Sequence, residues 1–264
     1  MINDAELNVV SNPIVMGVLD TNLKLDQIVR QAEQMMSDGA SIIDVAGCCE
    51  STRPGAVKVT VQEELDRVIP IIEKLSEHIS VPISVATSNP EVMIAAASAG
   101  AKMINDVLAL SKPGAINAAV KLRMPVCLMH IPRGMSSMQT DPVYKDVVSE
   151  VFAYLTQRVA QCVAEGIAPK NIIIDPGFGF GKNLQHNLNL LRSLQVFKSL
   201  HYPLLVGLSN KSFIGQILDA TIDQRIYGSI AAAVIAISKG ADIIRAHDVK
   251  ATVDAINILK AVQK

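Results

Sequence analysis

The feature that most constrains the fold is one pattern that occurs eight times along the chain. Each unit has a short apolar run, a polar loop and a longer segment with helical periodicity. The apolar runs occupy residues 13–19, 41–45, 82–85, 101–104, 125–129, 171–174, 203–208 and 241–244. Most are rich in valine and isoleucine, which is typical of parallel strands buried on both faces.

The segments between these runs predict amphipathic helices. In residues 143–164, for example, an apolar side chain recurs at every fourth position, at Val147, Val151, Leu155, Val159 and Val163. Eight strand-then-helix units without a linker or a change in composition predict a single α/β domain, a (β/α)8 TIM barrel over residues 1–264. An open, doubly wound sheet is the alternative.

Charge and composition exclude several classes of partner. The chain has 24 basic and 25 acidic residues, a net charge of −1, and no run of like charge, which argues against nucleic acid and anionic membranes as partners. Neither a membrane-spanning apolar stretch nor a secretory signal pattern is present, so we expect a cytoplasmic protein. The four cysteines lack zinc-site spacing: Cys127 and Cys162 are expected in the core, and Cys48 and Cys49 as free loop thiols.

Polar residues follow almost every predicted strand. In a barrel the carboxyl ends of all strands meet at one face, where active sites form. Some of these residues could simply cap the next helix. Burying so many polar groups near one mouth is costly unless a ligand or mutual pairing satisfies them, which favours a ligand site. The residues are Asp20, Asp44, Thr87, Asn105, Asp106, His130, Asp175, Ser209, Asn210, Lys211, Arg245 and His247.

Two motifs suggest ligand contacts at this face. The segment DPGFGFGK, from Asp175 to Lys182, has three alternating glycines that let the backbone approach a ligand, but its spacing is not that of a P-loop. Arg245 and His247 lie two residues apart, so in an extended strand they share a face and could clamp a diphosphate. The alternative for Arg245 is an ion pair with a local acid such as Asp248.

Two further loops carry groups suited to anions. In ESTRPG, Thr52 and Arg53 offer a hydroxyl and a guanidinium that suit a carboxylate. The segment from Ser209 to Ser212 places a lysine and two hydroxyls where a helix begins, which favours an anion or carbonyl.

Taken together, ESTRPGA, DPGFGFGKN, GLSNKSFIG and RAHDV resemble dihydropteroate synthases, and the likeness runs from about residue 13 to the C-terminus. The resemblance implies a (β/α)8 barrel, usually a homodimer. It implies a transferase of folate biosynthesis that condenses 6-hydroxymethyl-7,8-dihydropterin diphosphate with p-aminobenzoate and releases diphosphate. It also implies Mg²⁺, which assists the departure of diphosphate.

The resemblance also assigns roles to residues. Asn105, Asp175 and Lys211 would hydrogen-bond the pterin, with Met129 beside its ring. Arg245 and His247 would hold the diphosphate and, with Lys211, act in catalysis. The p-aminobenzoate site would be shaped by Thr52, Arg53, Phe180 and Ser212. Asp20 stands where the family has a metal-binding asparagine.

The sequence departs from the family at four places on the active face. The long first loop is reduced to residues 20–24, before a helix that begins at Leu25. Ala86 replaces an aspartate that bonds the pterin edge, and loss of such a buried charged bond typically costs on the order of 2–4 kcal/mol. Asn210 replaces an arginine. The loop that contains Cys48 and Cys49 is longer than in the family.

Three functions remain open from the sequence. The first is a dihydropteroate synthase, with activity lowered by these departures, which the retained Asn105, Asp175, Lys211, Arg245 and His247 favour. The second is a weak or inactive pterin- or phosphate-binding homologue, natural or engineered, which Ala86 and the short first loop favour. Methyl transfer from a folate is the third, and the motifs DPGFGFGK and ESTRPG argue against it.

Overall fold

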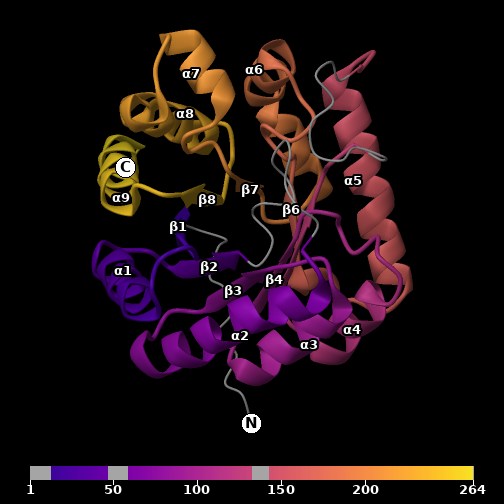
Figure 1. Ribbon diagram of the computed structural model, residues 1–264. Coiled ribbons are helices and arrows are strands. Elements are labelled where there is room, and N and C mark those ends of the chain that lie inside the picture. The colour runs from indigo at the N-terminus through magenta and orange to yellow at the C-terminus, as the bar shows by residue number, and fades with distance from the viewer. Residues whose placement is uncertain (1–12, 47–58, 133–142, 264) are drawn as a thin grey trace.

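The computed structural model describes residues 13–46, 59–132 and 143–263, in which strands and helices alternate (Figure 1). One eight-stranded sheet forms the centre. Its strands are β1 (Ile14–Val18), β2 (Ile42–Ala46), β3 (Ile83–Ala86), β4 (Met103–Asp106), β5 (Val126–Met129), β6 (Ile172–Asp175), β7 (Leu205–Val206) and β8 (Ile243–Ala246).

The sheet closes on itself. Its strand order is β6-β5-β4-β3-β2-β1-β8-β7, and every pairing is parallel. The two ends meet through a parallel bridge between Ile174 and Leu204, where Ile174 N also donates to Pro203 O at 2.9 Å. The predicted barrel is therefore confirmed, and the doubly wound alternative is wrong.

Helices surround the strands on the outside (Figure 1). Local capping sets several of their starts: the Thr60 side chain accepts from Glu63 N, and that of Asp146 accepts from Val148 N. The helices are α1 (Leu25–Ser37), α2 (Val61–His78), α3 (Pro90–Ala99), α4 (Ala115–Leu122), α5 (Val147–Ala164), α6 (Leu184–Arg192), α7 (Ser212–Leu218), α8 (Ile226–Ser238) and α9 (Val249–Gln263), with short 3-10 turns η2 (Pro169–Asn171), η3 (Leu194–Leu200) and η4 (Ile222–Gln224).

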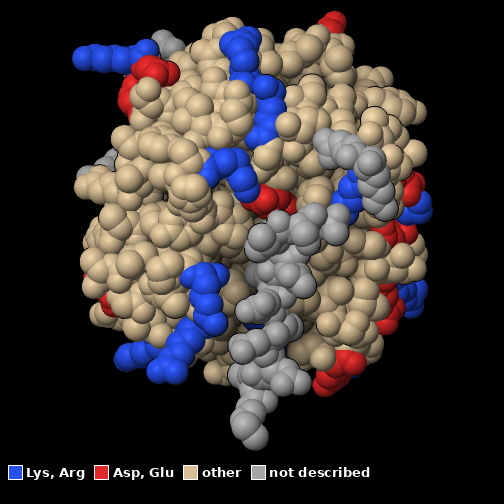
Figure 2. All heavy atoms as spheres, turned by 180° about the vertical axis from the view of Figure 1, so that it is seen from behind, with Lys and Arg blue, Asp and Glu red and all other residues tan. Residues whose placement is uncertain are grey.

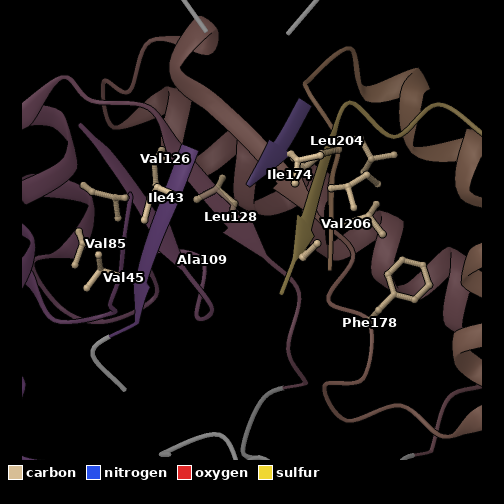
Figure 3. Packing of buried hydrophobic residues seen from close by; sticks show 14 of the residues in the cluster. Ile43, Val45, Val85, Ala109, Val126, Leu128, Ile174, Phe178, Leu204 and Val206 are labelled. Atoms are coloured by element: carbon tan, nitrogen blue, oxygen red, sulfur yellow. The ribbon is translucent and has the colours of Figure 1, made fainter. Parts of the chain in front are cut away.

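The apolar core has two parts. The larger lies between strands and helices, and includes Ile43, Val85, Val126 and Leu204 (Figure 3). The smaller takes one residue from every strand except β3, and so fills the barrel interior: Met16, Ile42, Met103, Cys127, Ile173, Leu205 and Ile243.

Strand alternation then positions the site. Side chains two residues apart on a strand share a face, so the residue two positions beyond each interior core residue also faces the interior, nearer the carboxyl end. On the described strands these residues include Asp44, Asn105, Met129, Asp175 and Arg245. The lower barrel is thus apolar and the mouth polar, as the sequence predicted.

The surface has a mixed character. On the face shown in Figure 2, charged side chains lie in small separate groups on a largely uncharged surface. Among the helices of the described ranges, none has the length and apolar character needed to cross a membrane.

Candidate active site

The floor of the polar mouth is a buried carboxylate–amide pair. Asn105 Nδ2 donates to Asp44 Oδ2 at 3.0 Å, and both side chains are almost wholly buried. Burial raises the pKa of Asp44, while the Arg245 guanidinium and nearby hydrogen bonds oppose the rise. Asn105 Oδ1 is buried without a hydrogen-bond partner in the described part of the chain. An acceptor left in this state suits a ligand that brings a donor.

Beside this pair lies an ion pair between β6 and β8. Arg245 Nη1 lies 3.1 Å from Asp175 Oδ2, and Asp175 Oδ1 accepts from Gly177 N at 2.7 Å. Burial lowers the pKa of Arg245, but the carboxylates of Asp175 and Asp44 outweigh it, so the net shift is upward and the guanidinium stays charged. Gly207 makes room for it, because a Cβ there would lie 2.5 Å from Arg245 Nη2.

Arg245 and His247 differ in their exposure, and the prediction that they share a face stays a prediction. Strand β8 ends at Ala246, so strict alternation does not extend to His247. The His247 side chain is exposed, with Nδ1 3.0 Å from Ser209 Oγ. The partner of Arg245 is Asp175, not the local acid Asp248 that was the alternative.

The glycine-rich segment after β6 packs against Lys211. Its Phe180 ring lies under Lys211 Nζ, 4.2 Å from the ring centroid. Lys211 is the N-cap of α7 and Ser212 its first residue, so both sit where the sequence predicted a helix to begin.

Two of the departures lie within this described site. Ala86 is the last residue of β3 and pairs in register with Asn105, so position 86 borders the pterin-binding candidates. Asn210 has a left-handed backbone, with φ of 58°, which asparagine adopts more readily than most residues. Its carbonyl accepts from Arg225 Nη1 at 3.0 Å, so another guanidinium lies next to this position.

The remaining predicted residues differ in how the structure describes them. Thr52, Arg53, Cys48 and Cys49 fall outside the described residues. Met129 lies at the mouth, where it is fully buried and pairs in register with Asp175. Asp20 is exposed at the carboxyl end of β1, where the short first loop runs into α1 at Leu25 as predicted. No group of three or more metal-ligating side chains occurs within the ranges that the structure describes.

Three residues have contacts in the structure that the sequence does not predict. From the sequence Asp44 is only a polar residue at a strand end, whereas in the structure it accepts from Asn105 Nδ2. His130 is likewise only a strand end in the sequence, whereas in the structure its Nδ1 lies 3.0 Å from Lys182 Nζ. Lys182 is only the last residue of the glycine motif in the sequence, whereas in the structure its side chain is buried and donates to Gly177 O at 2.8 Å and Phe180 O at 3.0 Å. That contact depends on how the loop folds back, which spacing does not reveal.

Fold and candidate site together define a class of protein: a (β/α)8 barrel with buried charged and polar side chains at the carboxyl ends of its strands, the face where such barrels bind ligands. Comparison with known proteins narrows this class. A family model described as pterin binding enzyme matches residues 7–247. A dihydropteroate synthase of Escherichia coli strain K12 is 48% identical over 261 residues, which cover 95% of this chain and 92% of that protein.

Solved structures agree. The Yersinia pestis dihydropteroate synthase in complex with a sulfonamide drug superposes with a TM-score of 0.92 at 46% identity, covering 97% of this chain and 96% of that one. The Xanthomonas albilineans enzyme in complex with 7,8-dihydropteroate gives a TM-score of 0.87 at 41% identity, covering 96% and 94%. The chain therefore belongs to the dihydropteroate synthase family of pterin-binding enzymes, as its motifs predicted, and is a transferase.

Proposed function

We propose that this chain joins 6-hydroxymethyl-7,8-dihydropterin diphosphate to p-aminobenzoate, forming dihydropteroate and releasing diphosphate in folate biosynthesis. The observation that carries the proposal is the layer of buried polar groups at the mouth: Asn105 and Asp175 beside the cationic Arg245. A relative of the same fold has been solved with 7,8-dihydropteroate bound.

The pterin would bind against Asn105 and Asp175, with Met129 beside the ring and Lys211 at its edge. A pterin presents a flat edge of donors and acceptors, and the amide and carboxylate offer the complementary atoms. Asn105 Oδ1, buried and without a partner among the described residues, gains a donor from the ligand. Asp175 would exchange its contact with Arg245 for the pterin.

The same exchange frees the guanidinium for the diphosphate. Arg245 leaves Asp175 as the pterin enters, and pairs with the negative charge that develops when the C–O bond breaks. His247 and Lys211, at the rim of the mouth, would donate further hydrogen bonds to the departing diphosphate. In this account the Arg245–Asp175 pair keeps both buried charges matched before substrate arrives.

The p-aminobenzoate would lie over Phe180, with its carboxylate toward Ser212 at the start of α7. A helix start offers backbone donors and a favourable dipole to a carboxylate. Thr52 and Arg53 are assigned to the same site through the ESTRPG motif.

We propose that Asp20 would be the protein ligand of a Mg²⁺ ion bound together with the diphosphate. The Asp20 carboxylate is exposed at the mouth, where Oδ1 accepts from Asn22 N and Nδ2, both at 3.1 Å. One carboxylate suits Mg²⁺, which is commonly held by one or two carboxylates together with substrate phosphates. When bound, the ion would neutralise charge on the departing diphosphate.

We further propose a homodimer in the cytoplasm. Exposed apolar side chains on α7, on η4 and on α8 support the dimer, because α7 and α8 are in contact and apolar surface gathered on neighbouring elements usually marks an interface. These residues, called the apolar patch below, are Ile217, Leu218, Ile222, Tyr227 and Ile235, and Tyr227 is 82% exposed. Cys127 and Cys162 are buried free thiols, which accords with a reducing compartment.

The experiment is an incubation with both substrates and Mg²⁺, followed by mass spectrometry of the products. We expect dihydropteroate and diphosphate in equal amounts. The second candidate, a pterin-binding homologue without turnover, is favoured by Ala86 and the short first loop. It would give calorimetric binding of a pterin analogue without dihydropteroate, and that result would overturn the proposed activity.

A further inference from the structure

The structure holds a buried ammonium behind the glycine-rich segment. The Lys182 side chain is only 8% exposed. Its Nζ donates to Gly177 O at 2.8 Å and to Phe180 O at 3.0 Å, and lies 3.0 Å from His130 Nδ1. The three donors of an ammonium thus meet three acceptors. Burying a cation costs free energy unless hydrogen bonds satisfy it, so these three contacts are what allows Lys182 to be buried here.

The third partner of Lys182, His130 Nδ1, connects the loop after β6 to the end of β5. When Lys182 is protonated it only donates, so His130 Nδ1 accepts and the His130 ring is neutral. Burial lowers the pKa of Lys182 to about 7, so below that pH the ammonium form predominates. His130 follows β5, and its backbone N donates to Asp175 O, the last residue of β6, at 2.9 Å. Its ring meets Tyr154 edge-on, with 4.9 Å between centroids. Lys182 therefore ties the loop after β6 to the end of β5.

Other contacts hold the same loop at its remaining turns. Gly179 N donates to Asn187 Oδ1 at 2.8 Å, and Tyr144 Oη donates to Gly181 O at 3.1 Å. Gly177, with φ of 72°, packs so closely that a Cβ would lie 2.0 Å from His130 O. These contacts restrain the loop at several of its turns, and the Lys182 Nζ donates to two of its carbonyls.

The other side of this loop carries active-site candidates. Phe180 contacts Lys211 Nζ at 4.2 Å from the ring centroid. A Cβ at Gly179 would lie 2.9 Å from Lys211 Cδ, so the backbone there packs directly on the lysine stem. A shift of the loop would displace Phe180 and alter the packing of the Lys211 side chain.

We propose that Lys182 is a positioning residue for the transfer reaction, which fixes the loop of residues 176–182 so that Phe180 and Lys211 keep their places at the barrel mouth. The proposal rests on the proposed function. Lys182 acts through the loop backbone and does not contact substrate.

The test compares Lys182→Met with Lys170→Met, a change at an exposed lysine of η2. Methionine keeps an unbranched side chain, one heavy atom shorter, and removes all three donors. We expect the KM for p-aminobenzoate to rise at least tenfold and kcat to fall at least tenfold in Lys182→Met, with the control unchanged. A purely structural role would lower the Tm and leave kcat and KM of the folded protein within twofold, and that result would overturn the proposal.

A second readout does not need turnover. Hydrogen–deuterium exchange of the peptide covering residues 176–183 should be at least tenfold faster in Lys182→Met than in the parent, and unchanged exchange contradicts the proposal even if the parent is inactive. Should Lys182→Met fail to fold, Tyr144→Phe removes another contact to the same loop. Tyr144→Phe should also raise the KM for p-aminobenzoate, by a smaller factor than Lys182→Met. If both this KM and the hydrogen–deuterium exchange of the loop are unchanged in Tyr144→Phe, the proposal is contradicted.

Discussion

At the residue scale, Ala86 is the departure with the clearest energetic consequence. It borders Asn105 in register at the end of β3. We expect Ala86→Asp to tighten binding of a pterin analogue about tenfold or more, since a hydrogen bond to a charged group contributes about 1.5–3 kcal/mol. The rate should gain little, because ground-state binding alone does not lower the barrier.

Calorimetry on Ala86→Asp checks this prediction, with Ala168→Asp at an exposed position as the matched control. Affinity equal to that of the parent would show that position 86 does not face the pterin. Weaker affinity would show that a further carboxylate near Asp44 and Asp175 repels more than it binds.

His130 gives a prediction for acid stability. Burial, together with the neighbouring Lys182 ammonium, lowers the pKa of His130 from 6.5 to about 3. The folded protein keeps this ring neutral, whereas the unfolded chain takes up a proton below pH 6.5. The free energy of unfolding should therefore fall as the pH drops from about 6.5 to 3, by on the order of a few kcal/mol.

Denaturant titrations at several pH values measure this slope. His130→Asn supplies an acceptor near Nδ1 without titrating, so its slope should be shallower. His201→Asn, at an exposed residue with a left-handed backbone, is the control and should retain the parent slope. Parallel slopes in all three proteins would rule out His130 as the cause.

Residue positions were predictable from the sequence, but their pairings were not. Alternation along strands and the motif DPGFGFGK placed Asn105, Asp175 and Arg245 at the mouth. The ion pair of Arg245 with Asp175 joins residues 70 positions apart, whereas local spacing suggests a nearby acid such as Asp248. Which of two acids a guanidinium reaches depends on barrel closure and on the space that Gly207 leaves.

At the scale of elements, the first β/α connection limits the chemistry. Only Leu19–Lys24 separate β1 from α1. We expect that replacing residues 20–24 with the family's long loop, in the Ala86→Asp background, raises kcat at least tenfold over Ala86→Asp alone. A lid that excludes water protects the reactive pterin while diphosphate leaves.

Steady-state kinetics of the two variants measure this effect. The loop replacement in the Ala86 background separates the contribution of the lid from that of the carboxylate. If the parent turns over as fast as the doubly changed protein, the short loop and Ala86 are not damaging, and this interpretation of the departures is wrong.

Elements themselves were predictable because their patterns are local. All eight strands lie within the predicted apolar runs or within two residues of them, and α1 begins at Leu25 as expected. The differences have local causes. Strand β7 covers only Leu205–Val206 of the predicted 203–208, and Pro203 has no N–H to donate. Helix α5 begins at Val147, later than predicted, because Asp146 caps it.

At the scale of the whole molecule, the apolar patch on α7, η4 and α8 predicts self-association. Ile235→Arg places a charge in the middle of α8, so it should convert a dimer to a monomer, or raise the dissociation constant at least a hundredfold. Light scattering after size exclusion measures the mass. Ile94→Arg, on the similarly exposed residue of α3, is the control and should leave the mass unchanged. A monomeric parent would contradict the proposed dimer.

The central claim is that this barrel mouth carries out the transfer reaction, and its most direct test is the initial rate of diphosphate release. The assay contains pterin diphosphate and Mg²⁺, with and without p-aminobenzoate, and compares the parent with Asp175→Asn. We predict release that depends on p-aminobenzoate in the parent and falls at least a hundredfold in Asp175→Asn. A rate of diphosphate release that does not depend on p-aminobenzoate, or that is unchanged in Asp175→Asn, would contradict the proposed reaction.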